Sequence, residues 1–152
     1  KETSFDGQGA RKYVKTYTVV YNYDPSGKKI KTTRFDPKQK EIRAMTFAYD
    51  ASGLLIQDIE YVEKEVEKYH RFEYDSAGRM IKAMEFHVKQ NGKGPDGVWF
   101  TPDDVVSSTK EFFYNADGTK SQDNKYISAG ADGKWFTADD GMQYYVLFEF
   151  KQ

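Results

Sequence analysis

The sequence contains no cysteine, which excludes disulfide bonds, thiol catalysis and thiolate metal sites. It also lacks long apolar runs, and no stretch approaches the roughly 20 residues that a membrane-spanning helix needs. Its 152 residues include 23 basic and 24 acidic side chains, which leaves a net charge of −1 and no field of one sign. We therefore expect neither a membrane span nor a nucleic-acid partner.

Aliphatic side chains are scarce as well. Leu, Ile, Val and Met together number 23, whereas Phe, Tyr and Trp number 25. A mean hydropathy of −0.83 is typical of disordered chains, but the near-zero net charge and the aromatic content argue against disorder. Tyr, Phe, Val and Thr favour strands. The composition therefore predicts a single all-β domain, residues 1–152, with a thin aromatic core.

A seven-residue pattern occurs four times: an aromatic residue, any residue, Tyr, Asp or Asn, two further residues and Gly. The copies begin at Tyr21, Phe47, Phe72 and Phe112. Successive copies of the Asp or Asn position are 26, 25 and 40 residues apart, and the last step equals one period plus an insertion of about 15 residues. A period of this length accommodates two strands and a turn. We therefore expect hairpin units at about residues 17–35, 45–61, 70–86 and 110–126.

The chemistry of the pattern explains the hairpin. Alternation places both aromatic rings on one face of a strand. Asp opens the turn by accepting a hydrogen bond from the backbone two residues on, and Gly adopts positive φ. In the second strand, Ile30 and Phe35 have opposite parity, which indicates either a bulge or a sheet that buries rings on both faces. The pattern Tyr residues are assigned to the core: Tyr23, Tyr49 and Tyr74.

Together these units predict an antiparallel meander of about 8 to 10 strands, either an open twisted sheet or a partly closed barrel. Residues 59–69 allow two interpretations. Ile59, Val62, Val66 and Tyr69 fall at helical spacing, whereas the repeats on both sides require strands. We favour a long charged hairpin, because the flanking repeats constrain the direction of the chain.

The units resemble the YD repeats of bacterial RHS-type cell-surface and toxin-casing proteins, whose signature is Tyr-Asp-x-x-Gly-Arg-Leu. Residues 74–80 fit best, with Met in place of Leu, residues 49–55 lack the Arg, and residues 114–119 match weakly. The resemblance covers roughly residues 17–126. Large RHS proteins wind many hairpins into a hollow shell, and four or five are too few to close one. The resemblance therefore implies a small stand-alone relative, an envelope lipoprotein or a secreted protein.

A second motif, Gly-x-Asp-Gly-x-Trp-Phe-Thr-x-Asp-Asp, occupies residues 94–104 and recurs at 130–140. The motif offers carboxylate oxygens and contains no His or Cys, a set of ligands that suits a hard cation such as Ca²⁺ better than zinc or copper. The motif is also similar to the Asp/Gly-rich loops of bacterial extracellular repeat proteins, where bound calcium is often implied. We therefore expect calcium as a cofactor at two sets of ligands: Asp96, Asp103 and Asp104, and Asp132, Asp139 and Asp140.

Two other interpretations of this motif stay open. In a metal-free form, Asp96 and Asp132 open turns, Thr101 or Asp103 caps a short helical turn, and the Trp-Phe pairs cover the end of the sheet. In a ligand-binding form, the two Trp residues of the chain bind a glycan or a peptide: Trp99 and Trp135.

We expect no enzyme. Acid–base catalysis by the paired carboxylates needs a deep cleft, which a short chain of hairpins does not supply. The Gly-x-Ser-x-Gly elbow and the phosphate-binding loop are both missing, and His70 and His87 have the setting of ordinary strand residues.

The expected function is a non-catalytic bacterial envelope or secreted module with a structural or adhesive role, stabilised by calcium. The alternative is a glycan- or peptide-binding module that uses exposed Trp and Tyr residues. In both cases the expected partner is a cell-surface or extracellular glycan or protein. Because the chain begins at Lys1 without Met or a signal segment, we expect a mature or trimmed chain, from which any signal peptide or lipid anchor has been removed. Open edges of such a sheet would allow strand pairing with a partner.

Overall fold

The computed structural model describes residues 2–5, 11–88 and 94–148. Two short strands, β1 (Glu2–Phe5) and β2 (Arg11–Lys15), form a separate hairpin. The main sheet has nine strands. They are β3 (Thr18–Tyr23), β4 (Lys29–Phe35), β5 (Glu41–Tyr49), β6 (Leu55–Val62), β7 (Glu65–Tyr74), β8 (Met80–His87), β9 (Ser108–Tyr114), β10 (Lys120–Ser128) and β11 (Gly141–Leu147).

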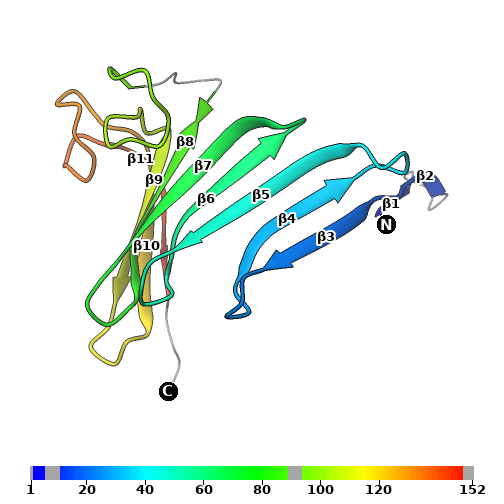
Figure 1. Ribbon diagram of the computed structural model, residues 1–152. Helices are drawn as coiled ribbons and strands as arrows, with labels where there is room; N and C mark the ends of the chain where they lie inside the picture. Colours follow the sequence, from blue (N-terminus) through cyan, green and yellow to red (C-terminus); the bar gives the residue numbers. More distant parts are fainter. Residues whose placement is uncertain (1, 6–10, 89–93, 149–152) are drawn as a thin grey trace.

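The nine strands lie side by side in sequence order, and each pair of neighbours is antiparallel. Figure 1 shows that the sheet twists from β3 to β11 and stays open. The predicted all-β antiparallel meander is therefore confirmed, and of the two predicted forms the open sheet is the one observed. No helix among the described residues is long and apolar enough to cross a bilayer.

Residues 59–69 form a hairpin between β6 and β7, as the repeat register predicted. The turn contains Glu63 and Lys64, whose φ angles of 50° and 73° are those of a tight two-residue hairpin loop. Of the two explanations for the parity of Ile30 and Phe35, the bulge is observed: in the pairing of β3 with β4, Asn22 pairs with Lys31 and Tyr23 with Lys29, so Ile30 is the extra residue.

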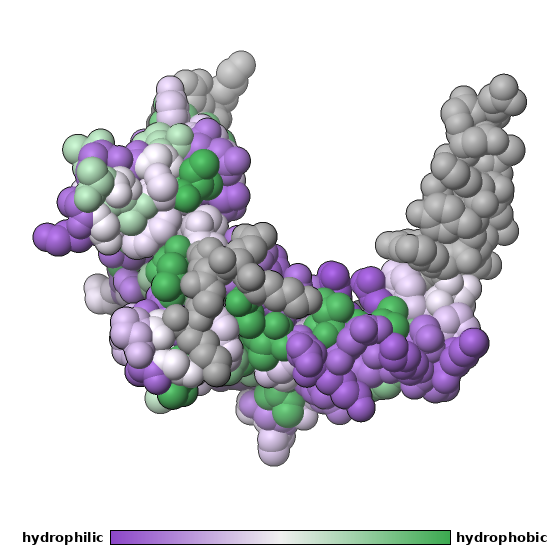
Figure 2. Space-filling view, turned by 90° about the horizontal axis from the view of Figure 1, so that it is seen from above, coloured by the Kyte–Doolittle hydropathy of each residue, from purple (hydrophilic) through white to green (hydrophobic). Residues whose placement is uncertain are grey.

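The main sheet is a single layer, so few side chains are fully covered. Four apolar residues are buried within the described part of the chain: Ala44, Tyr69, Phe86 and Tyr126. Figure 2 shows a bent outline, and on the visible surface apolar residues lie among hydrophilic ones. The assignment of Tyr23 to the core was wrong, because 57% of this residue is exposed, while Tyr49 and Tyr74 are half-buried.

Three of the four turns are held by the Asp of the pattern, whereas in the fourth Asp117 Oδ1 accepts the backbone N–H of Thr119. Asp24 Oδ1 accepts hydrogen bonds from the backbone N–H of Ser26 and of Lys28, both at 2.9 Å. Asp75 Oδ1 makes the equivalent bonds to Ala77 and Arg79, at 2.9 and 3.0 Å. The Gly that closes each turn has φ between 76° and 87°, a region that side chains disfavour: Gly27, Gly53, Gly78 and Gly118.

The Tyr of the pattern links neighbouring hairpins. Its hydroxyl donates a hydrogen bond to the carbonyl of the residue that begins the second strand of the preceding hairpin. The pairs are Tyr49 to Lys29 at 2.9 Å, Tyr74 to Leu55 at 2.8 Å, and Tyr114 to Met80 at 2.7 Å. Each bond contributes roughly 0.5–1.5 kcal/mol. Tyr23 belongs to the first hairpin of the main sheet, which explains its exposure.

Candidate functional site

The two Asp-rich loops fold onto one face of the sheet, which we call the loop face and define by Tyr69, Phe86 and Tyr126. In the first loop, Phe100 meets Tyr69 edge-on with ring centroids 5.0 Å apart, and Tyr69 stacks on Phe86 at 4.4 Å. In the second loop, Phe136 meets Tyr126 edge-on at 5.8 Å. The Phe of each motif therefore anchors its loop to the sheet.

The first loop is also tied down through Asp104. The buried Tyr69 hydroxyl donates a hydrogen bond to Asp104 Oδ2, which also accepts the N–H of Thr101 at 2.9 Å and lies 3.7 Å from Arg71 Nη2. Burial, together with this hydrogen bond, raises the pKa of Tyr69 above its usual range. The other oxygen, Asp104 Oδ1, is buried and has no partner in the described part of the chain. Asp104 therefore faces the sheet and holds the loop on it.

The second loop gathers oxygen atoms around one hydroxyl. Thr137 Oγ1 lies 3.4 Å from Asp132 Oδ1, 2.8 Å from Asp139 Oδ1 and 3.3 Å from Asp140 Oδ1. The carbonyl oxygen of Lys134 lies 3.2 Å from the same atom. A hydroxyl can donate only one hydrogen bond, so it cannot satisfy four acceptors. Carboxylate, hydroxyl and carbonyl oxygens are the donor set that Ca²⁺ takes in proteins.

Backbone N–H groups already occupy the same carboxylates. Asp103 Oδ2 accepts the N–H of Asp96 at 3.0 Å, and Asp139 Oδ2 accepts that of Ala131 at 2.7 Å. With the Thr101 hydroxyl as the main cause, these bonds hold the pKa of Asp103 below its ordinary value, and the equivalent bonds do so for Asp139. Across the ranges that the structure describes, no group of three or more His, Cys, Asp or Glu is arranged to hold a metal. Calcium at these loops stays a prediction.

The two Trp residues are both half-buried. Trp135 lines a hollow of about 510 Å³ that lies between the two loops, and Asp104 lines it from the other loop. Val105 and Ile127 also line this hollow and are 46% and 52% exposed. The structure thus brings the second Trp and residues that flank the first loop to one open, partly apolar surface.

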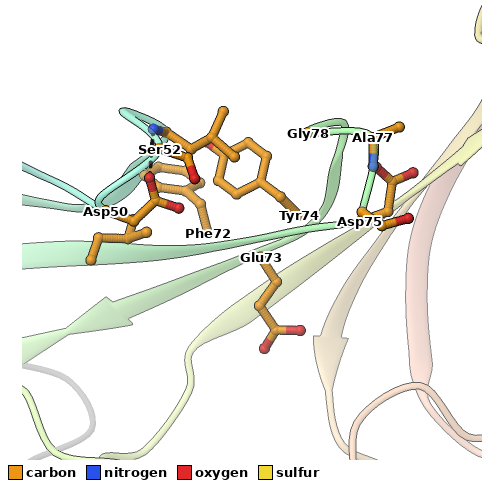
Figure 3. A pocket seen from close by; sticks show the side chains of 11 residues that line it. Asp50, Ser52, Phe72, Glu73, Tyr74, Asp75, Ala77 and Gly78 are labelled. Atoms are coloured by element: carbon orange, nitrogen blue, oxygen red, sulfur yellow. Dashed lines mark hydrogen bonds between the residues drawn. The ribbon is translucent and has the colours of Figure 1, made fainter.

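A second hollow, of about 770 Å³, lies between the neighbouring turns that begin at Asp50 and Asp75. Figure 3 shows that Phe72 and Tyr74 point to the side of the sheet on which these turns lie, whereas Glu73 points to the other side. Both Asp residues use Oδ1 to hold their own turns. The two Asp side chains of this hollow therefore hold the turns of the repeat.

An ionic cluster lies on the opposite face of the sheet, which we call the charged face and define by Asp58, His70 and Glu85. These three residues are directly opposed on β6, β7 and β8. His70 Nδ1 lies 2.6 Å from Asp58 Oδ1, and Nε2 lies 3.1 Å from Glu85 Oε2. Lys68 Nζ and His87 Nε2 lie 3.1 and 3.3 Å from the Glu85 carboxylate. A ring with a carboxylate at each nitrogen is favoured in its doubly protonated, positive form.

The pKa shifts agree with this geometry. Burial alone would lower the pKa of His70, but the hydrogen bonds to Asp58 and Glu85 outweigh it and raise the pKa above 6.5. Burial alone would raise the pKa of Glu85, but Lys68 and His70 lower it to about 2. The cluster thus joins three strands electrostatically.

Sequence reasoning missed this cluster, because it treated both His residues as ordinary strand residues. Asp58 and Glu85 lie 12 and 15 residues from His70 in the chain. Only the register of three adjacent strands brings them together, and the sequence pattern alone does not give that register.

The sequence matches neither a protein-family model nor a curated protein. Solved structures do match. A Bacteroides fragilis protein of unknown function has a TM-score of 0.59 at 8% identity, over 88% of this chain and 93% of that one. The Photorhabdus luminescens Tc holotoxin pore matches with a TM-score of 0.53 at 13% identity, over 93% of this chain. The complex of TcdB2–TccC3 with Cdc42 matches with a TM-score of 0.54 at 15% identity, over 97% of this chain.

The chain spans 7% of the length of each of the two toxin chains. At identities this low, the similarity concerns the fold alone. The chain therefore shares a β-hairpin repeat fold with Tc toxin chains of the RHS type, as a distant structural relative.

Proposed function

We propose that this chain is a non-catalytic β-repeat module with a structural or adhesive role in the bacterial envelope or outside the cell. The observation that carries the proposal is the open, single-layered sheet, whose two edge strands expose large apolar side chains on β3 and on β11. Exposed apolar surface of this kind is typical of surfaces that contact a partner. An adhesive or wall-forming module needs such a surface.

The polar groups support the same proposal, because their interactions build the sheet. Asp24 and Asp75 hold turns, and Asp104 binds its loop to Tyr69. His70 is enclosed between two carboxylates. These groups serve the architecture, which is what a structural module requires of them.

Calcium is the second part of the proposal, and we place it at the second loop. The four oxygen atoms around Thr137 Oγ1 support this location, whereas Asp104 of the first loop faces Tyr69. A cation that binds only the folded state adds about 2.7 kcal/mol at a hundredfold excess over its Kd.

A thermal melt in EDTA, then in CaCl₂, then in MgCl₂, tests calcium binding. We expect a rise of several degrees with Ca²⁺ alone, which Asp139→Asn abolishes and Asp103→Asn, its counterpart in the first loop, preserves. Equal melting temperatures in EDTA and in millimolar CaCl₂ would contradict the proposed cation and favour loops held by hydrogen bonds.

The hollow lined by Trp135 favours one other candidate, a glycan- or peptide-binding module. Retention of fluorescent beads coated with the chain, measured on purified bacterial envelope fractions, separates the two functions. We expect retention to survive both Trp135→Ala and the control Trp99→Ala. Loss of retention with Trp135→Ala alone, at an unchanged circular dichroism spectrum, would favour ligand binding. Absence of retention by the unmodified chain would contradict the adhesive role.

A further inference from the structure

We propose that β11 is a pairing edge for a second copy of this chain. The two β11 strands run antiparallel about a two-fold axis and join two nine-stranded sheets into one. The inference rests on the proposed structural or adhesive function and names the partner of one of its exposed edges.

The distribution of charge along the sheet is the first observation. The strands β3 and β11 contain no charged residue, whereas each of the seven strands between them contains at least two. Proteins that keep a sheet edge free protect it with charges, most often Lys, with Pro or with a bulge. Here the charges lie on the inner strands and are missing from both edges, and the bulge of β11 at Gln143 leaves a regular stretch from Tyr144 to Leu147. The edges therefore have the composition of strands that pair.

Apolar exposure selects β11 over β3. Of the seven residues of β11, five are large, apolar and exposed: Met142, Tyr144, Tyr145, Val146 and Leu147, between 39% and 61%. In β3, only three of the six residues are large, apolar and exposed: Val20, Tyr21 and Tyr23. Because successive side chains of a strand point to opposite faces, β11 offers apolar contacts on both faces of the sheet.

The missing charge also indicates that the partner is a second copy. In a two-fold strand pair, each residue lies opposite residues of the same strand, so any charge near the axis would meet a charge of the same sign. A strand without charges avoids this repulsion. A charged peptide, in contrast, would find no complementary charge on β11.

Strand direction decides which edges of two copies can pair. Nine strands that alternate in direction leave β3 and β11 parallel to each other. Pairing β11 with β3 of another copy by simple translation would therefore create a parallel pair within an antiparallel sheet. Pairing β11 with β11 continues the antiparallel order. An axis near Tyr145, beyond the register shift at Gln143, would place Tyr144 of each copy opposite Val146 of the other, which gives two apolar cross-strand pairs.

Because the chain has no cysteine, disulfide cross-linking tests the pairing directly. A single introduced Cys can form a disulfide only with the same Cys of a second molecule. Directly opposed residues of an antiparallel pair have Cα atoms about 4.5–5.5 Å apart, a separation that a disulfide can bridge. Tyr144→Cys and Tyr145→Cys place the thiol at the expected axis, and Tyr21→Cys places it on β3 as the matched control. Under mild oxidation we expect covalent dimers from at least one β11 variant and none from the β3 variant.

Sedimentation velocity over a range of concentrations gives the second measurement. We expect the unmodified chain to form dimers, Tyr145→Lys to remain monomeric with an unchanged circular dichroism spectrum, and Tyr21→Lys to form dimers as before. A monomer up to millimolar concentration, equal loss of dimers in both variants, or loss in Tyr21→Lys alone would each overturn the inference. If the chain is monomeric and coated beads are still retained on envelope fractions, the inference fails and the proposed function stands.

Discussion

Replacing Glu85 by Gln would remove the central charge of the cluster on the charged face and leave its shape nearly unchanged. The carboxylate contacts Lys68, His70 and His87. Its pKa falls from 4.5 to about 2 on folding, which corresponds to roughly 3 kcal/mol in favour of the ionised form. Because 26% of the side chain is exposed, solvent screening reduces this contribution. We expect Glu85→Gln to lower the free energy of unfolding by about 1–2 kcal/mol near pH 6.

The pH dependence of this loss has a definite sign. The pKa of His70 is raised on folding, so its stabilisation is complete below the unfolded value of 6.5 and disappears as pH rises through the folded pKa. The pKa of Glu85 is lowered on folding, so its contribution to stability has the opposite pH dependence. That contribution is complete above pH 4.5 and disappears as pH falls toward 2. The cluster therefore stabilises the fold most between pH 4.5 and pH 6.5, the unfolded pKa values of Glu85 and His70. In Glu85→Gln, the pKa of His70 should fall because one carboxylate is gone.

Urea unfolding from pH 4 to pH 9 measures the free energy, and NMR measures the titration of His70. The chain has only two histidines, which simplifies the spectrum. Glu73→Gln is the matched control, since Glu73 lies on the neighbouring strand β7, its side chain is 50% exposed, and it reaches Lys82 only at 4.0 Å. Equal unfolding midpoints for Glu85→Gln and the unmodified chain would refute the reasoning. A His70 pKa at or below 6.5 in the unmodified chain would do the same.

Other substitutions test the repeat and the loops. Tyr74→Phe removes the bond to the Leu55 carbonyl and should lower the free energy of unfolding by about 1 kcal/mol in urea, whereas Tyr23→Phe should leave it unchanged. Gln39 has φ of 64° in its turn, so Gln39→Gly should raise the melting temperature, and a fall would contradict backbone strain there. Phe100→Ala should lower the melting temperature by several degrees, because it uncovers Tyr69; an unchanged value would show that Phe100 does not anchor the first loop.

The repeat could be predicted because its signals are local. The alternation of rings, the turn-forming Asp and the Gly with positive φ all lie within seven residues, and the period orders the hairpins. The spacing around Tyr69 resembled a helix, but the neighbouring units correctly favoured a hairpin there. Sheet closure had no such local signal, because closure depends on twist summed over many strands. The exposure of Tyr23 follows from its position in the first hairpin of the main sheet, which the pattern alone does not reveal.

The candidate site shows the same division. The sequence located both loops, and its metal-free interpretation placed the Trp-Phe pairs on the sheet. It did not show that the Phe of each pair, Phe100 and Phe136 with φ of 72° and 69°, packs edge-on against the rings of the sheet. It also missed the cluster around His70. The pairing of β6 with β7 shifts register between Glu60 and Tyr61, so the pair Asp58–His70 is not the one that counting from the turn would give. One extra residue in a strand changes which side chains face each other, and periodicity alone does not locate it.

The strict neighbour-to-neighbour order of the main sheet has a consequence for how the chain folds and how its length can change. Within the described residues, every strand pairs by backbone hydrogen bonds only with strands next to it in the sequence. Such local contacts close short loops, which favours fast folding that can begin at any hairpin and spread to both sides. The connection from β8 to β9 is the longest in the main sheet, so the pairing of β9 with β8 should be the slowest step of folding. Duplication or loss of one hairpin, about 25 residues, would leave every other strand with a neighbour to pair with.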